Sequence, residues 1–272
     1  MERWTEQLEE LARRSLPEAV HRYIRQGARD GVSAAEAVEA WDRFRFLPAV
    51  LRDVTEIDCS TELLGTPVRS PFAIAPTTMQ RAAHRDGEAA MARAAVASET
   101  LMVVSSNAGT TFEEIAQTGV AWWLQLYVPS DRLACKPLID RAVDAGGSAV
   151  VLTADTPVVG TKYDGGSETV WDLAEPGWLG ANFPQGYGDL PGHEKAADLG
   201  PHDIDWLGKT TGLPVVVKGV LRPGDARRCV DAGASAVWRP APRRAPAHRT
   251  RPPTRAPGRR RGGARRRRRR SG

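Results

Sequence analysis

The sequence lacks several features that would assign it to a class of protein at once. Its three cysteines, Cys59, Cys135 and Cys229, are an odd number and lie far apart, which favours reduced thiols over disulfides or a zinc site. No apolar run approaches the roughly 18 residues of a membrane-spanning helix. The N-terminal stretch MERWTEQLEELARRSL is charged and amphipathic, without the apolar core of a signal peptide. We therefore expect a cytoplasmic protein with no membrane span.

The C-terminal stretch 239–272 lacks Asp, Glu, Lys, Leu, Ile, Val and Phe altogether and contains fifteen arginines. Residues 1–238 therefore carry 23 basic and 33 acidic side chains, a net charge of −10, although the whole chain has +5. The body is an ordinary acidic domain, and the tail alone makes the chain basic. A tail of this composition cannot bury a core, and we expect residues 239–272 to be disordered.

From residue 72 onward, short apolar runs alternate with helical segments. The runs predict strands at 72–76, 101–106, 121–128, 148–154, 213–219 and 235–238. Continuously apolar strands separated by helices are typical of a parallel sheet that is covered on both faces. Residues 5–50 predict helices, with Ser33 as the N-cap of one of them. The stretches VDAGGSAVV (143–151) and VDAGASAVW (230–238) repeat one helix–turn–strand unit, which favours a barrel.

The predicted fold class is therefore α/β: an incomplete (β/α)8 TIM barrel with about six of its eight strands, preceded by a helical segment. Residues 1–238 form this partial domain. Within it, residues 160–205 are rich in glycine and proline and show little periodicity. They follow the carboxyl end of the fourth strand, on the face where barrel active sites lie, so we interpret them as a lid or loop insertion.

Polar side chains recur where the predicted strands end. The set comprises Pro76, Thr77, Thr78, Ser105, Ser106, Gln125, Tyr127, Thr153, Asp155 and Lys218. It has neither paired carboxylates for glycoside chemistry nor a cluster with metal-ligand spacing, so we expect no metal site. Taken singly, each residue is equally well explained as a hydrogen-bonding group at a strand end. Their recurrence on five strands predicts a site for a polar, planar ligand, with a lysine where negative charge lies.

Several motifs resemble one family in both order and spacing. They are SPFAIAPTTMQRAAHRDGEAAMARAA, SSNAGTTFEEIA, WWLQLYVPSDR, VVLTADTPVVG and LPVVVKGVLRPGDARRCVDAGASAVW. Together they resemble the FMN-dependent α-hydroxy-acid oxidases and dehydrogenases of the glycolate oxidase and lactate oxidase type. The resemblance runs from about residue 5 to residue 238. It implies a TIM barrel with FMN at its carboxyl-end mouth, a small 2-hydroxy acid as substrate, oxygen or an electron carrier as acceptor, and a homo-oligomer in intact relatives.

The resemblance also implies roles for single residues. Pro76, Thr77 and Thr78 match a turn that runs past the flavin. Ser105, Gln125 and Thr153 match groups that hydrogen-bond the isoalloxazine edge, and Lys218 matches a lysine beside flavin N1 and O2, where it stabilises negative charge. Tyr23 and Tyr127 match two tyrosines that contact the substrate. From the residues alone, Tyr23 is also compatible with a helix-packing role, and Lys218 with a surface position at the end of its strand.

Two positions near the substrate depart from the family pattern. The family usually has an arginine in DTPxxGxR that grips the substrate carboxylate, and Lys162 stands there in DTPVVGTKYDGG. Lysine supplies a point charge without the planar fork of arginine, so the exchange is not conservative. Asn107 stands where many members have an aromatic residue, which predicts a more polar pocket.

The largest departure follows Trp238. In the family this strand continues into VSNHGGRQLD, whose histidine is the general base and whose arginine binds the carboxylate; glycine- and arginine-rich loops then bind the FMN phosphate. Here RPAPRRAPAHRT follows instead. Shifted by one base, the codon junctions across residues 242–248 can encode His-Gly-Gly-Arg-Gln-Leu, although the two junctions before them cannot encode serine and asparagine. We interpret residues 239–272 as an out-of-frame reading and expect the chain as written to be inactive.

Two other functions remain open on the residues alone. A different phosphate-binding TIM-barrel enzyme would share the alternation of strands and helices but not the APTTMQ, QLYV and VVKGV motifs. The arginine-rich tail could instead bind nucleic acid through its phosphates, and such binding would weaken steeply with salt. Because the tail begins in mid-strand without a linker, we expect no specific nucleic-acid partner.

Overall fold

The computed structural model describes residues 4–156, 160–161, 168–175 and 177–240. Three helices come first: α1 (Trp4–Ser15), α2 (Glu18–Arg25) and α3 (Val32–Trp41). They confirm the predicted helical segment, but the predicted cap is wrong. Helix α3 begins at Val32, before Ser33, and Gly31 occupies the N-cap position with a positive φ of 69° that glycine adopts without strain.

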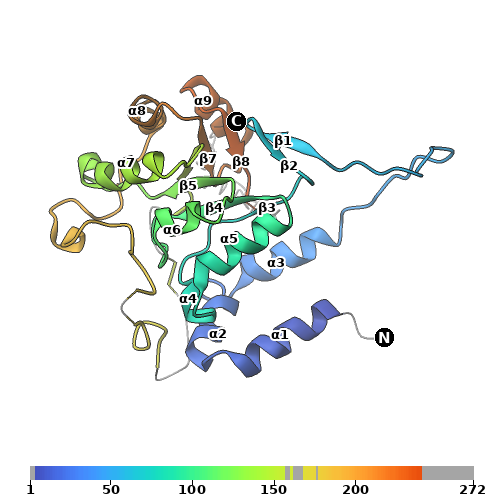
Figure 1. Ribbon diagram of the computed structural model, residues 1–272, viewed down its shortest axis with the longest axis horizontal. Helices are drawn as coiled ribbons and strands as arrows, with labels where there is room; N and C mark the ends of the chain where they lie inside the picture. Colours follow the sequence, from blue (N-terminus) through green and yellow to red (C-terminus); the bar gives the residue numbers. More distant parts are fainter. Residues whose placement is uncertain (1–3, 157–159, 162–167, 176, 241–272) are drawn as a thin grey trace, which may run out of the picture.

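A six-stranded parallel sheet forms the centre of the molecule (Figure 1). Its strands lie side by side in chain order: β3 (Ala73–Ile74), β4 (Leu101–Ser105), β5 (Trp122–Leu126), β6 (Val150–Thr153), β7 (Val215–Lys218) and β8 (Ala236–Trp238). All six predicted strands are confirmed. Parallel neighbours in unbroken chain order, joined by helices, are the arrangement of a (β/α)8 barrel, and the six strands form an incomplete TIM barrel.

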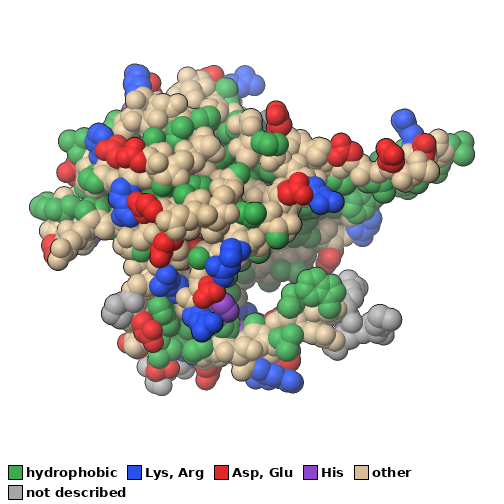
Figure 2. Space-filling view, viewed as in Figure 1, with side chains coloured by type: hydrophobic (Ala, Val, Ile, Leu, Met, Phe, Trp, Pro, Cys, Tyr) green, Lys and Arg blue, Asp and Glu red, His purple; other side chains and the backbone are tan. Residues whose placement is uncertain are grey.

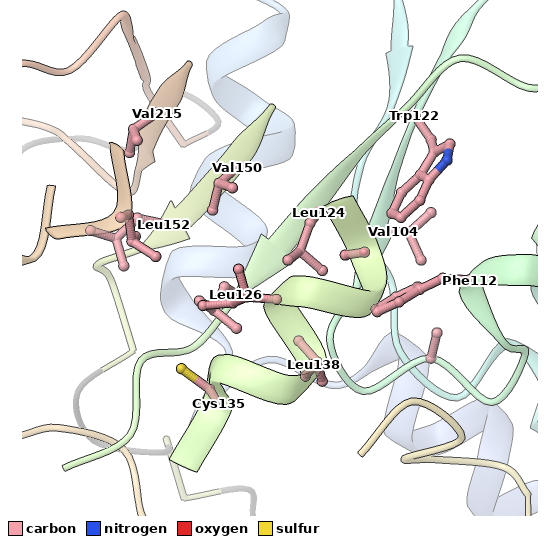
Figure 3. Close-up of a cluster of buried hydrophobic side chains, with 14 of the residues drawn as sticks. Val104, Phe112, Trp122, Leu124, Leu126, Cys135, Leu138, Val150, Leu152 and Val215 are labelled. Atoms are coloured by element: carbon pink, nitrogen blue, oxygen red, sulfur yellow. The ribbon is translucent and has the colours of Figure 1, made fainter. Parts of the chain in front are cut away.

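Helices cover the outer face of this sheet. They are α5 (Gly87–Ala97), α6 (Phe112–Ala116), α7 (Lys136–Asp144), α8 (Pro201–Thr211) and α9 (Pro223–Asp231), with a 3-10 turn η1 at Arg132–Cys135 before α7. The short helix α4 (Gln80–Ala83) follows β3, and its Ala82 packs near Val20 of α2. Alternate strand residues, among them Leu124, Leu126 and Leu152, pack against helix residues such as Phe112 and Leu138 (Figure 3). This outer layer is the largest hydrophobic cluster of the described chain.

The inner face of the sheet carries the other alternate residues. Val103, Trp123, Val151 and Val216 form a second apolar cluster toward the amino ends of the strands. A short antiparallel hairpin that the sequence did not predict, β1 (Thr61–Leu63) and β2 (Thr66–Val68), packs its Val68 into this cluster. Apolar side chains therefore close one end of the inner face. The chemistry of the other end depends on the residues that follow along each strand.

Helix α6 shows how local sequence sets a boundary of the fold. Thr111 precedes it, its hydroxyl accepts a hydrogen bond from Glu114 N at 3.2 Å, and the Glu114 carboxylate accepts from Thr111 N at 3.1 Å. This reciprocal pair satisfies two amide groups that the helix itself leaves without partners. Thr111 is therefore the N-cap of α6.

The insertion 160–205 is less irregular than its sequence suggests. A 3-10 turn, η2 (Tyr187–Asp189), lies within it, and α8 begins at Pro201, so its last five residues are helical, which corrects the predicted boundary. Asn182 is fully buried against the turn before α6. The described part of the insertion thus packs on the barrel; whether it moves as a lid stays a prediction.

Residues 42–60 form an arm between α3 and β1 that stands away from the rest of the molecule (Figures 1 and 2). Hydrophobic side chains lie exposed along it, including Phe46 and Leu47. No helix in the described parts of the chain is both long enough and apolar enough to span a bilayer. The predicted tail lies almost entirely outside the described residues, which end at 240.

Candidate active site

A row of polar side chains crosses the inner face at the carboxyl ends of four strands. Ser105 of β4 is the register partner of Gln125 of β5, and Thr153 of β6 is the partner of Lys218 of β7. Gln125 closes the gap between the two pairs, because its Nε2 donates to Thr153 Oγ1 at 2.9 Å. Ser105, Gln125 and Thr153 are all buried. The structure therefore brings together four of the predicted cofactor-binding residues.

Lys218 supplies a cation at one end of this row. Its Nζ lies 3.3 Å from the Asp155 carboxylate, and both side chains are about three-quarters buried. The approach depends on Gly219, whose φ is +107° and where an added Cβ would lie 2.5 Å from Asp155 Cβ. Lys218 is thus held by a carboxylate that lies two residues beyond the end of β6, and it stands beside the polar row.

The turn after β3 borders the row at its other end. Pro76 is half-buried and Thr77 is exposed, whereas Thr78 Oγ1 donates to Asn107 O at 3.3 Å. Asn107 belongs to the turn after β4, and its amide N–H donates to Ser105 Oγ at 3.2 Å. The Thr78 contact therefore joins two successive strand-end turns. The flavin contact that the resemblance implies for residues 76–78 stays a prediction.

Two buried polar side chains fix the turn after β4. Glu88 of α5 is fully buried and accepts hydrogen bonds from Gly109 N at 3.3 Å and Thr110 Oγ1 at 2.9 Å. From the opposite side, Asn182 Oδ1 accepts from Phe112 N at 2.8 Å and its Nδ2 donates to Thr110 O at 3.0 Å. Buried polar groups need such partners, so these contacts hold in place the segment that follows Ser105.

Tyr127 follows β5 directly and stands beneath a second lysine. Lys195 Nζ lies 3.8 Å from the centroid of the Tyr127 ring, over its face. Burial raises the pKa of the Tyr127 phenol; a hydrogen bond with Thr156 opposes this rise, and the charges of Asp155 and Tyr23 add to it. Burial lowers the pKa of Lys195, which Asp155 opposes. Tyr127 and Lys195 are therefore both partly shielded from water, and both lie near Asp155.

Tyr23 lies in a separate cluster that reaches the same mouth. It packs with Val20, Met79 and Val170, and its ring meets Trp171 edge-on with 5.9 Å between centroids. Met79 belongs to the turn after β3, so this cluster ties α2 to the candidate site. The packing role that the sequence left open for Tyr23 is thus present, and Tyr23 also lies near enough to Tyr127 to raise the pKa of that phenol.

Lys162, the predicted substrate-binding lysine, lies outside the described residues. Sequence reasoning missed Lys195, since it stands in a glycine- and proline-rich stretch without periodicity. It placed Asp155 among the polar residues at the strand ends without giving it a specific role, and it missed Asn182. The described residues hold no group of three or more side chains suited to a metal ion.

Comparison with known proteins places this geometry in a family. Residues 12–238 match the model of the family described as FMN-dependent dehydrogenase. Spinach (Spinacia oleracea) glycolate oxidase is 38% identical over 244 residues, which cover 84% of this chain and 65% of that protein. Human 2-hydroxyacid oxidase 1 is 36% identical, with 84% and 66% covered. The chain thus spans just under two thirds of the length of these relatives.

Solved structures agree with the sequence comparison. A mandelate oxidase superposes with a TM-score of 0.74 at 32% identity, covering 85% of this chain and 66% of that one. A lactate oxidase, described as putative, from Pediococcus acidilactici gives a TM-score of 0.74 at 28% identity, covering 85% and 64%. The matched family segment ends at Trp238, where the arginine-rich stretch begins. The resemblance predicted from the motifs is confirmed: the chain belongs to the FMN-dependent dehydrogenase family.

Proposed function

We propose that the protein from which this barrel derives oxidises a small (S)-2-hydroxy acid to the 2-oxo acid, with FMN as cofactor and oxygen or an electron carrier as acceptor. The observation that carries the proposal is the polar row Ser105–Gln125–Thr153–Lys218 on the inner face. Family membership supports it, because the similar glycolate and 2-hydroxyacid oxidases are named for this substrate class. It also disfavours a phosphate-binding barrel enzyme of another class.

The residues present fit the ring system of FMN. An isoalloxazine edge offers alternating hydrogen-bond donors and acceptors, and the row presents two hydroxyls and one amide, which can each donate and accept. Lys218 adds a fixed cation next to them. When bound, FMN would accept the two electrons that leave the substrate. A preorganised ammonium in a partly dry site stabilises developing negative charge more than water does, and Lys218 would do this for the ring.

The remaining residues would handle the substrate. Tyr127 and Tyr23 are neighbours at the mouth of the barrel, and their hydroxyls can donate to a carboxylate or to the hydroxyl of a 2-hydroxy acid. Because burial raises the pKa of Tyr127, its proton stays in place for donation at neutral pH and above. Lys162 would add a positive charge, and Asn107 a polar wall.

The sequence as printed has no histidine at the family's position for the base. We propose that it does not turn over, and that residues 239–272 are an out-of-frame reading of the segment with the base and the phosphate-binding loops. The end of the family match at Trp238 supports this. DNA sequencing across codons 236–250 tests it: a single-base shift should restore HGGRQL, and a gene in which no such shift does so contradicts it.

The activity itself is tested on a chain with the restored frame. Purified anaerobically, it should show a flavin absorption spectrum that bleaches on addition of (S)-lactate, glycolate or (S)-mandelate and recovers in air. The printed chain serves as control and should neither bleach nor form 2-oxo acid. A frame-restored chain that binds FMN but bleaches with no 2-hydroxy acid would refute the substrate class, and one without flavin would refute the cofactor.

The fifteen arginines favour one second candidate, a nucleic-acid-binding arm. Such an arm would bind duplex DNA with an affinity that falls steeply with salt. Deletion of residues 239–272 should then abolish binding without altering the barrel. Electrophoretic mobility shifts at two salt concentrations decide between this function and an out-of-frame tail.

A further inference from the structure

The insertion 160–205 delivers one lysine to the inner side of the barrel mouth. Residues 192–196 run antiparallel to the segment that leaves β5. Asp131 N donates to Gly192 O at 2.9 Å, Ser130 N to Glu194 O at 2.7 Å, and Ala196 N to Val128 O at 2.9 Å. Pro129 and Lys195 form the bridge at the centre of this pairing. The position of Lys195 is therefore set by backbone hydrogen bonds on both of its sides.

The pairing also fixes the direction of the chain around Lys195. Ala196 is buried against the outer layer. The side chain of Lys195 lies over the ring of Tyr127, which precedes Pro129 by two residues. The quadrupole of an aromatic ring attracts an ammonium placed over its face. The contact therefore holds the charged end of the Lys195 side chain as well as its aliphatic part. The lysine is half-buried, and desolvation lowers its pKa.

The charge of Lys195 is available to a ligand. The nearest acid of the candidate site, Asp155, is paired with Lys218 at 3.3 Å. Among the residues that the structure describes, Lys195 forms no ion pair, and its one specific contact is with the Tyr127 ring. Hydrogen bonds are about 2.8 Å long, so an anion bound by the Tyr127 hydroxyl lies within reach of an ammonium placed over the same ring.

We propose that Lys195 binds the carboxylate of the substrate together with Tyr127, and so selects acids over their neutral analogues. The inference rests on the proposed function for the identity of the acid, but the binding of a small 2-hydroxy carboxylate needs neither FMN nor turnover. Lys195 thereby supplies from the insertion a cation additional to the one expected at Lys162. Its role is to touch the substrate, and it takes no part in moving a proton.

The test uses the full printed chain and isothermal titration with sodium (S)-lactate, with (S)-lactamide as the neutral analogue. The chain should bind lactate measurably better than lactamide. Lys195→Met, which keeps the apolar stem over Tyr127, should weaken lactate binding about tenfold or more and leave lactamide unchanged, since a charge-assisted hydrogen bond is lost. Lys195→Arg should retain most of the affinity. Lys209→Met on the exposed side of α8 is the matched control and should bind like the parent.

Unchanged lactate binding by Lys195→Met, or no preference for lactate over lactamide in the parent, would overturn the proposal and leave Lys195 as a packing residue. Circular dichroism of each variant shows that the fold is retained; if Lys195→Met unfolds, Lys195→Gln takes its place. The result is independent of the proposed redox function. Lysine-dependent lactate binding in a protein whose frame-restored form never bleaches would refute the oxidation and keep the anion site.

Discussion

The two faces of the β3–β8 sheet are built from alternate residues of the same strands, yet they differ in chemistry. On the outer face the strand residues stay apolar to their carboxyl ends, as at Leu126 and Leu152. On the inner face, apolar residues give way to polar ones two positions further along the strand. Val103 is followed by Ser105 in β4, and Val151 by Thr153 in β6. The outer face thus carries the larger part of the core, whereas the carboxyl end of the inner face presents the hydrogen-bonding groups to which the proposed function assigns a ligand.

The largest expected difference in stability is between variants of two adjacent residues of β5, Leu126 and Gln125. Leu126→Ala should lower the free energy of unfolding by about 2–5 kcal/mol, because it leaves a cavity in the fully buried outer layer. Gln125→Leu should cost less, about 1–3 kcal/mol, because it leaves no cavity and removes one hydrogen bond from the buried Thr153 Oγ1. Urea denaturation followed by circular dichroism measures both. Equal losses would show that the two faces do not differ in this way.

The insertion should stabilise the outer side of the fold through Asn182. Asn182→Ala removes partners from Phe112 N and Thr110 O, both buried, and should cost about 2–3 kcal/mol. Asn182→Asp places a carboxylate in a fully buried site opposite the Thr110 carbonyl and should cost at least as much. Urea midpoints of the two variants test this, and a stability equal to that of the parent would mean that the insertion is not anchored there.

The ion pair on the inner face should contribute little to stability. Asp155→Asn removes the charge beside Lys218, and partly exposed ion pairs are worth about 1 kcal/mol or less. A thermal midpoint that shifts by only a few degrees is expected. A loss as large as that of Leu126→Ala would place the inner carboxyl end among the structural elements of the fold.

The smallest effect concerns the thiols. Burial raises the pKa of Cys135, in the outer layer, to about 12 from an ordinary value of 9.0, whereas Cys59 is exposed. At pH 8, iodoacetamide should label Cys59 first and Cys135 last, as mass spectrometry can show. A raised pKa means that the folded state holds the proton more tightly, so stability falls as pH rises from 9 toward 12. Early labelling of Cys135 would indicate an open outer layer.

The sequence predicted the six main strands because each is a continuous apolar run, and it predicted the polar row because side chains alternate along a strand. It missed the hairpin at Thr61–Val68, whose three-residue strands are too short to show alternation. Helix α8 was missed because it follows a glycine- and proline-rich stretch. The contact of Lys195 with Tyr127 depends on backbone pairing between segments more than sixty residues apart, which leaves no local trace.

The central claim is that the polar carboxyl end of the inner face binds FMN. The most direct measurement is the flavin content of the purified frame-restored chain, set beside those of its Gln125→Leu and Lys209→Met variants. The parent and Lys209→Met should retain a stoichiometric amount of FMN, and Gln125→Leu should lose most of it while staying folded. Full retention by Gln125→Leu, or a parent without flavin, would contradict the account.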